Sequence, residues 1–353
     1  MTLAERDASP SIRRLSMTMC VAVRYLPFAV FCRLTTDDFH LGHCSCRMTR
    51  VKPKYFFILV VATLACLFYP GNHYLYNLEL NNPDAFAEPL PLPTLAYPIP
   101  AMKIGVKDPK VSAQGIYIVE RKTFTPVFVK NPDTQYYPAS TTKMVTALTT
   151  IDLMKAQDVI KVDVATAEGQ IMDLVPGEKM SVENLLYGML VHSANDAAYA
   201  IANYRNDYAG FIDHMNIIAK RIGMKNSSFR NPAGLDEDGQ LTTPHDLALA
   251  ARTLLDNPVL RKMVSVREIT VMDEDYRITH VLTNVNELLG MIEGLGGIKT
   301  GYTEAAGQNL VSYFKTPYTG HEYIIVVMKS EDRFADTQTL TEWLTYNIEY
   351  LEP

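Results

Sequence analysis

Tyr137-Pro-Ala-Ser140-Thr-Thr-Lys143-Met144 is the most informative segment of this 353-residue chain. The proline and the apolar residues that follow predict a helix over residues 140–154, with Ser140 in its first turn. Residues three apart lie on one helical face, so Lys143 can reach the Ser140 hydroxyl. A lysine can activate a serine if burial and a second cation lower its pKa. The alternative is a serine that only caps a helix.

Ser-x-x-Lys alone is not specific, because it recurs at Ser312–Lys315. That segment has the pattern of a strand, in which residues three apart point to opposite faces. The second pair therefore cannot cooperate.

Two further short motifs, each present once, stand downstream. Ser193-Ala-Asn195 lies between two helical patterns, where a turn can aim a hydroxyl and a carboxamide into a cleft, although an ordinary loop has the same composition. Lys299-Thr300-Gly301 is expected to end a strand, where it offers a cation and a hydroxyl to a carboxylate and a glycine that permits close backbone approach. An ordinary edge-strand ending would look the same.

The three motifs in this order resemble the Ser-x-x-Lys, Ser-x-Asn and Lys-Thr-Gly triad of penicillin-binding proteins and serine β-lactamases. Their flanks are most similar to the D-alanyl-D-alanine carboxypeptidase family of low-molecular-mass penicillin-binding proteins. The resemblance extends over about Met102–Tyr350. Four blocks carry it: Tyr137–Met144, Glu183–Ala198, Asn231–Thr243 and Gly297–Thr303.

The resemblance implies a serine peptidase that removes the terminal D-alanine from peptidoglycan stem peptides through an acyl-serine intermediate. Ser140 would attack the penultimate D-alanine carbonyl, with Lys143 as the base. Ser193 would pass the proton to the leaving D-alanine, and Asn195 would hold the peptide. The resemblance also implies inhibition by β-lactams and requires no metal or other cofactor.

Substrate binding is assigned in the same way. Lys299 and Thr300, beside Gly301, would bind the terminal carboxylate, and Lys299 would keep Lys143 neutral by like-charge repulsion. The backbone N–H groups of Ser140 and Tyr302 would hold the oxyanion.

One segment departs from the family pattern. Leu282–Leu289 resembles a family segment that in some members carries an arginine where Val285 stands. Carboxylate binding by that arginine is therefore not expected here, and Arg333 is the candidate to contribute in its place.

Three other functions compete. A peptidoglycan D,D-endopeptidase would use the same chemistry on a cross-link. A β-lactamase is disfavoured, because Ala194 stands where class A enzymes usually have aspartate and no deacylating glutamate segment is evident. A non-catalytic wall-binding protein would not need Ser140, Lys143, Ser193, Asn195 and Lys299 together.

Strand-like patterns at both ends of the motif-bearing region, with helical patterns between them, predict an α+β fold with one antiparallel sheet flanked by helices and a helical subdomain. The resemblance implies the same fold, that of serine β-lactamases and penicillin-binding proteins. The strands are expected at Gly115–Glu120, Pro126–Lys130, Glu268–Met272, Asn309–Phe314 and Tyr323–Met328. The helices are expected at Ser181–Val191, Asp196–Tyr204, Tyr208–Ile222, Thr243–Leu255 and Phe334–Tyr350.

The N-terminal part predicts a membrane anchor. Tyr55–Tyr69 is uncharged and follows Arg50, Lys52 and Lys54, which favours a cytoplasmic N-terminus and a catalytic domain outside the membrane. A cleaved signal segment or a buried helix is the alternative.

We therefore expect four regions: a basic cytoplasmic N-terminus (1–54), a membrane anchor or signal segment (55–76), a proline-rich spacer (77–101) and a peptidase domain (102–353). Met48 begins a complete basic-then-apolar export signal, so we expect residues 1–47 not to belong to the native protein.

Charge and cysteine content limit the partners. Residues 1–54 carry a net charge of +5 and the remainder −11, which leaves no electrostatic footprint for nucleic acid. All five cysteines lie at or before Cys66, so the rest is compatible with export. His40, His43, Cys44 and Cys46 lack a second Cys/His pair at a useful spacing, and we expect no metal site.

Overall fold

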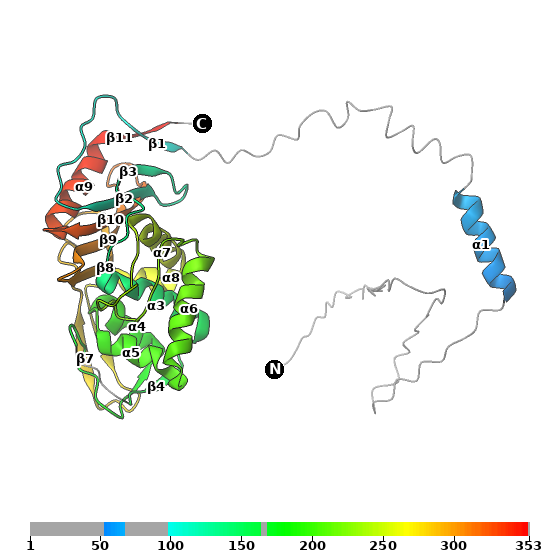
Figure 1. Ribbon diagram of the computed structural model, residues 1–353, viewed down its shortest axis with the longest axis horizontal. Coiled ribbons are helices and arrows are strands. Elements are labelled where there is room, and N and C mark those ends of the chain that lie inside the picture. Colours follow the sequence, from blue (N-terminus) through cyan, green and yellow to red (C-terminus); the bar gives the residue numbers. More distant parts are fainter. Residues whose placement is uncertain (1–52, 68–97, 164–167, 352–353) are drawn as a thin grey trace, which may run out of the picture. The chain divides into compact units, whose positions relative to one another are not determined.

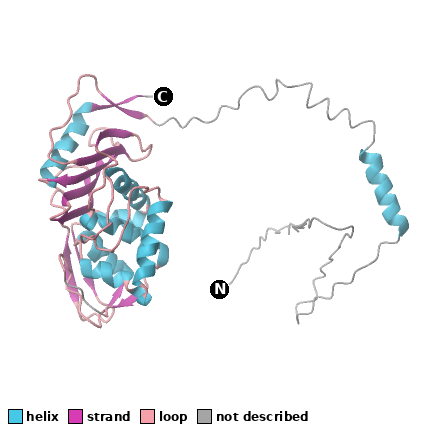
Figure 2. Cartoon of the chain, viewed as in Figure 1, coloured by secondary structure: helices cyan, strands magenta, loops and turns pink. Residues whose placement is uncertain are grey.

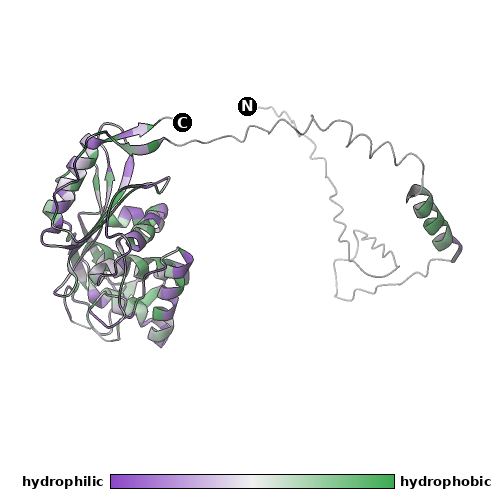
Figure 3. Ribbon diagram, turned by 45° about the horizontal axis from the view of Figure 1, so that its top comes forward, coloured by the Kyte–Doolittle hydropathy of each residue, from purple (hydrophilic) through white to green (hydrophobic). Residues whose placement is uncertain are grey.

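The computed structural model describes residues 53–67, 98–163 and 168–351, and the chain divides into two units after Pro93. In the first unit, helix α1 (Pro53–Leu67) is hydrophobic over most of its length (Figure 3). Across the described ranges, no helix combines the length and hydropathy needed to cross a membrane. The predicted basic N-terminus up to residue 52, residues 68–76 of the predicted membrane segment and most of the predicted spacer lie outside the described residues.

Five antiparallel strands form the central sheet of the second unit, in the order β3-β2-β10-β9-β8 (Figures 1 and 2). They are β2 (Gly115–Glu120), β3 (Pro126–Lys130), β8 (Leu295–Thr303), β9 (Gly307–Lys315) and β10 (Glu322–Ser330). β2 and β3 have the predicted bounds, and β9 and β10 extend the predicted strands at both ends. Because β8 is an edge strand, one side of its backbone is open to another partner.

Successive side chains of the sheet enter two separate cores. In β2, Tyr117 and Val119 enter the larger core, whereas Ile116 and Ile118 enter the smaller one. Helix α9 (Arg333–Asn347) closes the smaller core with Leu340, Trp343 and Leu344. The larger core also contains side chains of α3 (Lys143–Leu153), α4 (Val182–Val191), α5 (Asn195–Ala202), α6 (Tyr208–Arg221), α7 (Pro244–Asp256) and α8 (Pro258–Val264). The α+β prediction with a helical subdomain is confirmed.

Two small hairpins complete the helical side. β4 (Val159–Lys161) pairs with β5 (Lys179–Ser181), and β6 (Glu268–Met272) pairs with β7 (Thr279–Thr283). Of these strands only β6 was predicted. β7 escapes the pattern because a histidine, His280, occupies a buried position of the alternation, where it contacts a Glu178 carboxylate oxygen at 2.6 Å.

Both ends of the folded domain differ from the prediction. The last helix ends at Asn347 rather than at Tyr350, and β11 (Ile348–Leu351) follows it. β11 pairs with β1 (Ile99–Met102), so residues 99–101 belong to a sheet and not to the proline-rich spacer. Four-residue strands carry too little alternation to be recognised singly, and their pairing across the chain helps to stabilise them.

Candidate active site

Ser140 lies in a 3₁₀ helix, η2 (Ala139–Thr142), that runs directly into α3. In this tighter helix, residues three apart eclipse one another, which favours the predicted Ser140–Lys143 contact. Ala139 has a φ of +46°, a left-handed conformation that costs a non-glycine residue free energy. The turn is held from β9, because Asn309 Nδ2 donates to the Pro138 carbonyl at 3.1 Å.

Gly234 fits against the same turn. Its φ is +92°, and a Cβ there would overlap the carbonyl oxygen of Ala139, so only glycine is accommodated. Asn231 fixes this glycine, because its Oδ1 accepts the backbone N–H of Gly234 at 2.8 Å and of Leu235 at 3.1 Å. The block Asn231–Thr243 therefore supports the turn that carries Ser140.

Lys143 is fully buried at the start of α3. Its Nζ donates to Asn195 Oδ1 at 2.6 Å and to the Ala233 carbonyl at 2.8 Å, and it lies 2.8 Å from Ser140 Oγ. Both oxygens can only accept, so they occupy two N–H groups of the amine. In a neutral amine the lone pair then remains for the Ser140 hydroxyl.

Burial, and next the charge of Lys299, hold the pKa of Lys143 well below its usual range. Asp196 opposes this shift. The predicted effect of Lys299 is thus present but is the smaller of the two lowering causes.

Ser193 and Asn195 lie at the corner between α4 and α5. Ser193 is buried with a φ of +62°, and Asn195 is the first residue of α5. Asn195 bonds to the segment after β4 through its backbone N–H, which donates to the Gln170 carbonyl at 2.7 Å, and through Nδ2, which donates to the Glu168 carbonyl at 2.5 Å. The side chain that orients Lys143 is thus itself held at both ends.

Lys299, Thr300 and Gly301 lie within β8, not at its end as predicted. A Cβ on Gly301 would come within 3.0 Å of the Ser140 backbone nitrogen, so glycine lets this edge strand approach the nucleophile. Lys299 is buried, and burial together with the charge of Arg333 lowers its pKa to about 7.

A cavity of about 300 Å³ unites these elements. Its lining includes six of the eight predicted site residues: Ser140, Ser193, Asn195, Thr300, Gly301 and Tyr302. Lys143 reaches it through Ser140, and Lys299 lies buried beside Thr300. Val285 and Arg333 also line the cavity.

Arg333 brings a guanidinium group to the cavity that Val285 also lines. Its Nη1 donates to the Gly301 carbonyl at 2.9 Å, while its buried Nε has no partner among the described residues. Burial lowers its pKa. Neither aspartate nor glutamate is present in the described lining of the cavity, which therefore favours an anion.

Several supporting groups were not identified from the sequence: Asn309, the Ala233 carbonyl and the Glu168–Gln170 segment. Asn309 left a weak signal, since it is a polar residue directly before the buried apolar pair Leu310 and Val311. The carbonyl contacts left none, because every residue has a carbonyl. In the described ranges, no three His, Cys, Asp or Glu side chains could together hold a metal ion.

Comparisons with known proteins point to one family. The D-alanyl-D-alanine carboxypeptidase family profile matches residues 102–332. D-alanyl-D-alanine carboxypeptidase DacF of Bacillus subtilis is 34% identical over 207 residues, which are 55% of this chain and 52% of the relative. DacA of Haemophilus influenzae is 30% identical over 264 residues, 70% and 65% of the two chains. The chain thus spans about half to two thirds of the length of these relatives.

Solved structures show the same fold. A penicillin-binding protein homologue from Mycobacterium tuberculosis superposes with a TM-score of 0.64 at 27% identity, over 69% of this chain and 95% of that one. The DD-transpeptidase of Streptomyces K15 superposes with a TM-score of 0.63 at 26% identity, over 68% of this chain and 99% of that one. A mutant of the same enzyme is covered over 98% of its chain. The predicted penicillin-binding-protein fold is confirmed.

Proposed function

The chain belongs to the D-alanyl-D-alanine carboxypeptidase family, and on that premise we propose that it removes the terminal D-alanine from peptidoglycan stem peptides through an acyl-serine intermediate. The observation that carries the proposal is the environment of Lys143: a buried amine with two carbonyl acceptors and the Ser140 hydroxyl at 2.8 Å.

Lys143 acts as the general base. Burial and Lys299 lower its pKa, which raises the fraction of neutral amine whose lone pair can take the Ser140 proton. The Ser140 oxygen then attacks the penultimate D-alanine carbonyl. The backbone N–H groups of Ser140 and Tyr302 stabilise the oxyanion, which the close approach of Gly301 to the Ser140 nitrogen supports.

Ser193 returns the proton to the leaving D-alanine, and Asn195 holds both Lys143 and the peptide. The acyl-enzyme that remains is hydrolysed by water. Both residues line the cavity with Ser140, as these roles require.

The terminal carboxylate binds among Lys299, Thr300 and Arg333. Lys299 and Arg333 have no acidic partner in the described lining of the active-site cavity. An anionic substrate that enters the cavity supplies this partner. Arg333 approaches from α9, so an arginine at position 285 is not needed.

The partners and location follow from the same function. β-Lactams acylate Ser140, and the catalytic domain acts on the extracytoplasmic side of the cell membrane. With a start at Met48, the basic residues 48–54 remain in the cytoplasm, residues 55–76 anchor the chain in the membrane, and the proline-rich segment after them spaces the domain from it.

Peptide mapping after exposure of the full chain to benzylpenicillin tests the nucleophile, with Ser140→Ala as the matched control. We expect the unmodified chain to form a stable adduct on Ser140 and to release D-alanine from a pentapeptide substrate. We expect Ser140→Ala to do neither. A folded protein without adduct or penicillin hydrolysis would contradict the proposal. Cleavage of cross-linked dimers with no release from pentapeptides would instead support the endopeptidase.

A further inference from the structure

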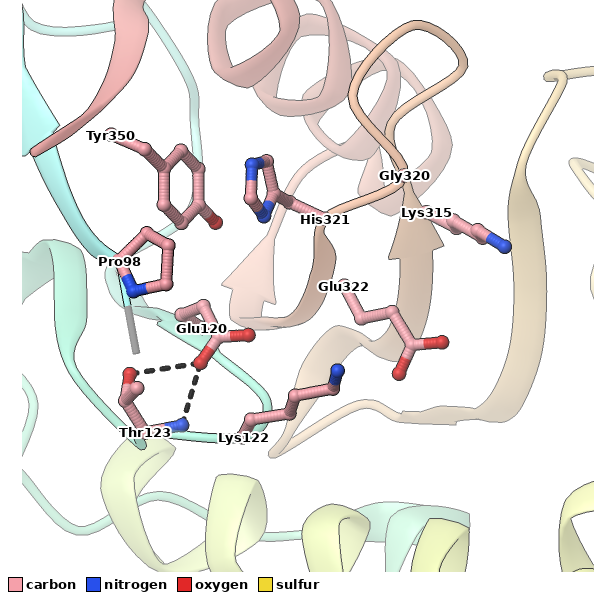
Figure 4. Close-up of a pocket in the computed structure, with 9 residues that line it drawn as sticks. All are labelled: Pro98, Glu120, Lys122, Thr123, Lys315, Gly320, His321, Glu322 and Tyr350. Carbon is pink, nitrogen blue, oxygen red and sulfur yellow. Dashed lines mark hydrogen bonds between the residues drawn. The ribbon is translucent and has the colours of Figure 1, made fainter. Parts of the chain in front are cut away.

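A second cavity, also of about 300 Å³, lies between the β2–β3 turn and the β9–β10 turn (Figure 4). It shares no lining residue with the active-site cavity among the described residues. Its lining is Pro98, Glu120, Lys122, Thr123, Lys315, Gly320, His321, Glu322 and Tyr350. Opposite charges and a flat aromatic surface therefore meet in one small space.

Glu120 is the most unusual member of this lining, because it is only 5% exposed. One carboxylate oxygen, Oε2, accepts the backbone N–H of Thr123 at 2.6 Å and its hydroxyl at 2.8 Å. The other oxygen points toward the space that Lys122 and Glu322 also border in Figure 4, and it has no hydrogen-bond partner in the described part of the chain. A buried carboxylate is stabilised when such an oxygen receives a charged donor.

Glu322 does not play the same role. It accepts from Arg121, Arg261 and the Tyr313 hydroxyl, and although burial opposes the shift, these bonds lower its pKa to about 2. Its charge is thus already neutralised by two arginines. Glu120 is left as the acceptor for a cation from outside.

Lys122 supplies the opposite charge. In Figure 4 its ammonium extends toward the space between Glu120 and Glu322, yet it forms no ion pair within 4.0 Å with any described residue. Tyr350 stacks on His321 with ring centroids 3.3 Å apart, which gives the cavity a flat wall. A ligand with both charges and a small apolar group would complement these features.

We propose that this cavity binds a small zwitterionic amino acid, whose ammonium group contacts the free oxygen of Glu120 and whose carboxylate contacts Lys122. The apolar side chain of the ligand packs on Tyr350. A cavity of this size accepts a ligand as small as alanine and excludes a folded partner. The site is independent of the function proposed for Ser140.

Equilibrium dialysis of the full chain against radiolabelled D-alanine tests this proposal, with L-alanine as a second probe. Propionate and ethylamine each carry half of the zwitterion, and we expect each to compete at least about tenfold more weakly than alanine. Because the active site can also hold D-alanine, binding is measured before and after reaction with benzylpenicillin. Binding that persists after acylation supports the second site, and binding abolished by acylation overturns it.

Two substitutions locate the ligand. Glu120→Gln keeps the size and an acceptor for Thr123 but removes the charge, and Lys122→Met removes the ammonium. We expect each to weaken alanine binding at least about tenfold, whereas Lys225→Met, a control at an exposed lysine elsewhere, leaves it unchanged. If Glu120→Gln does not fold, Lys122→Met decides alone. Equal binding by Lys122→Met and the unmodified chain, or no saturable binding at all, would refute the site.

Discussion

The active site contains three basic side chains without an ion-pair partner among the described residues, those of Lys143, Lys299 and Arg333. Burial is the first cause that lowers the pKa of each. Buried basic groups without an acidic partner destabilise a fold, so we expect these three to serve substrate binding or catalysis. In the proposed mechanism Lys143 acts as a neutral base, whereas Lys299 and Arg333 act as cations. The two lysines therefore need opposite protonation states, which sets a pH window for activity.

We expect kcat/KM for D-alanine release to fall on both sides of this window. Above the pKa of Lys299, about 7, its ammonium loses the proton that attracts the substrate carboxylate, and the rate falls by about tenfold per pH unit from pH 8 upward. At lower pH the rate falls because Lys143 becomes protonated. A pH profile of kcat/KM, which reports the free enzyme, measures both limbs.

Lys299→Arg separates the two limbs. A guanidinium stays charged over the whole range, so the alkaline fall should disappear while the acid fall persists. If the alkaline limb keeps its position in this variant, Lys299 is not the group responsible.

At the scale of elements, short motifs predicted which segments meet, but not what holds them together. The sequence placed Ser140 and Lys143 on one helical turn, and it related that turn to Ser193-Ala-Asn195 and Lys299-Thr300-Gly301 through a family resemblance. The supports were not predictable, because a carbonyl such as that of Ala233 has no sequence signature. His280 and the four-residue β11 were missed for a related reason: their stability comes from distant partners.

Gly234→Ala tests whether the loop after Asn231 positions the nucleophile. The new Cβ would overlap the Ala139 carbonyl, and a left-handed conformation is also unfavourable for alanine. Gly177→Ala is the matched control, since its φ is +90° with no atom within 4 Å of the new Cβ. We expect Gly234→Ala to lower the free energy of unfolding by about 2 kcal/mol more than the control, by urea denaturation.

The same pair should differ in activity. Gly234→Ala displaces the Ser140 turn and slows acylation by benzylpenicillin, whereas Gly177→Ala does not. Equal losses of stability and of acylation rate in the two variants would mean that the Gly234–Ala139 contact is unimportant.

His192 joins three elements around the active site. Its Nδ1 donates to the Thr283 carbonyl of β7 at 3.1 Å, so its Nε2 accepts from Gln170 Nε2 at 2.7 Å. The backbone carbonyl of Gln170 in turn accepts the backbone N–H of Asn195. Gln in place of His192 offers one donor and one acceptor, and Leu offers neither. We expect His192→Leu to slow acylation several-fold and His192→Gln to restore most of the rate. Indistinguishable variants would limit His192 to packing.

In the folded domain as a whole, the first and last described strands, β1 and β11, pair with each other. β1 follows the proline-rich segment, β11 is the last described strand, and the four residue pairs between them join the entry of the domain to its end. Ile348 and Tyr350 of β11 also pack against the smaller core behind the sheet. The family resemblance starts at about Met102, so it offers no reason to include Ile99–Ala101 in the domain.

Removal of β1 should therefore destabilise the domain. A chain shortened to begin at Lys103 loses all four β1–β11 pairs, whereas one that begins at Thr94 keeps them. Because each cross-strand pair contributes about 0.2–1 kcal/mol, we expect the shorter chain to lose about 1–4 kcal/mol of unfolding free energy and to melt several degrees lower. Thermal unfolding of the two chains under the same conditions measures the difference. Equal melting temperatures would show that the pairing of β1 with β11 does not stabilise the domain.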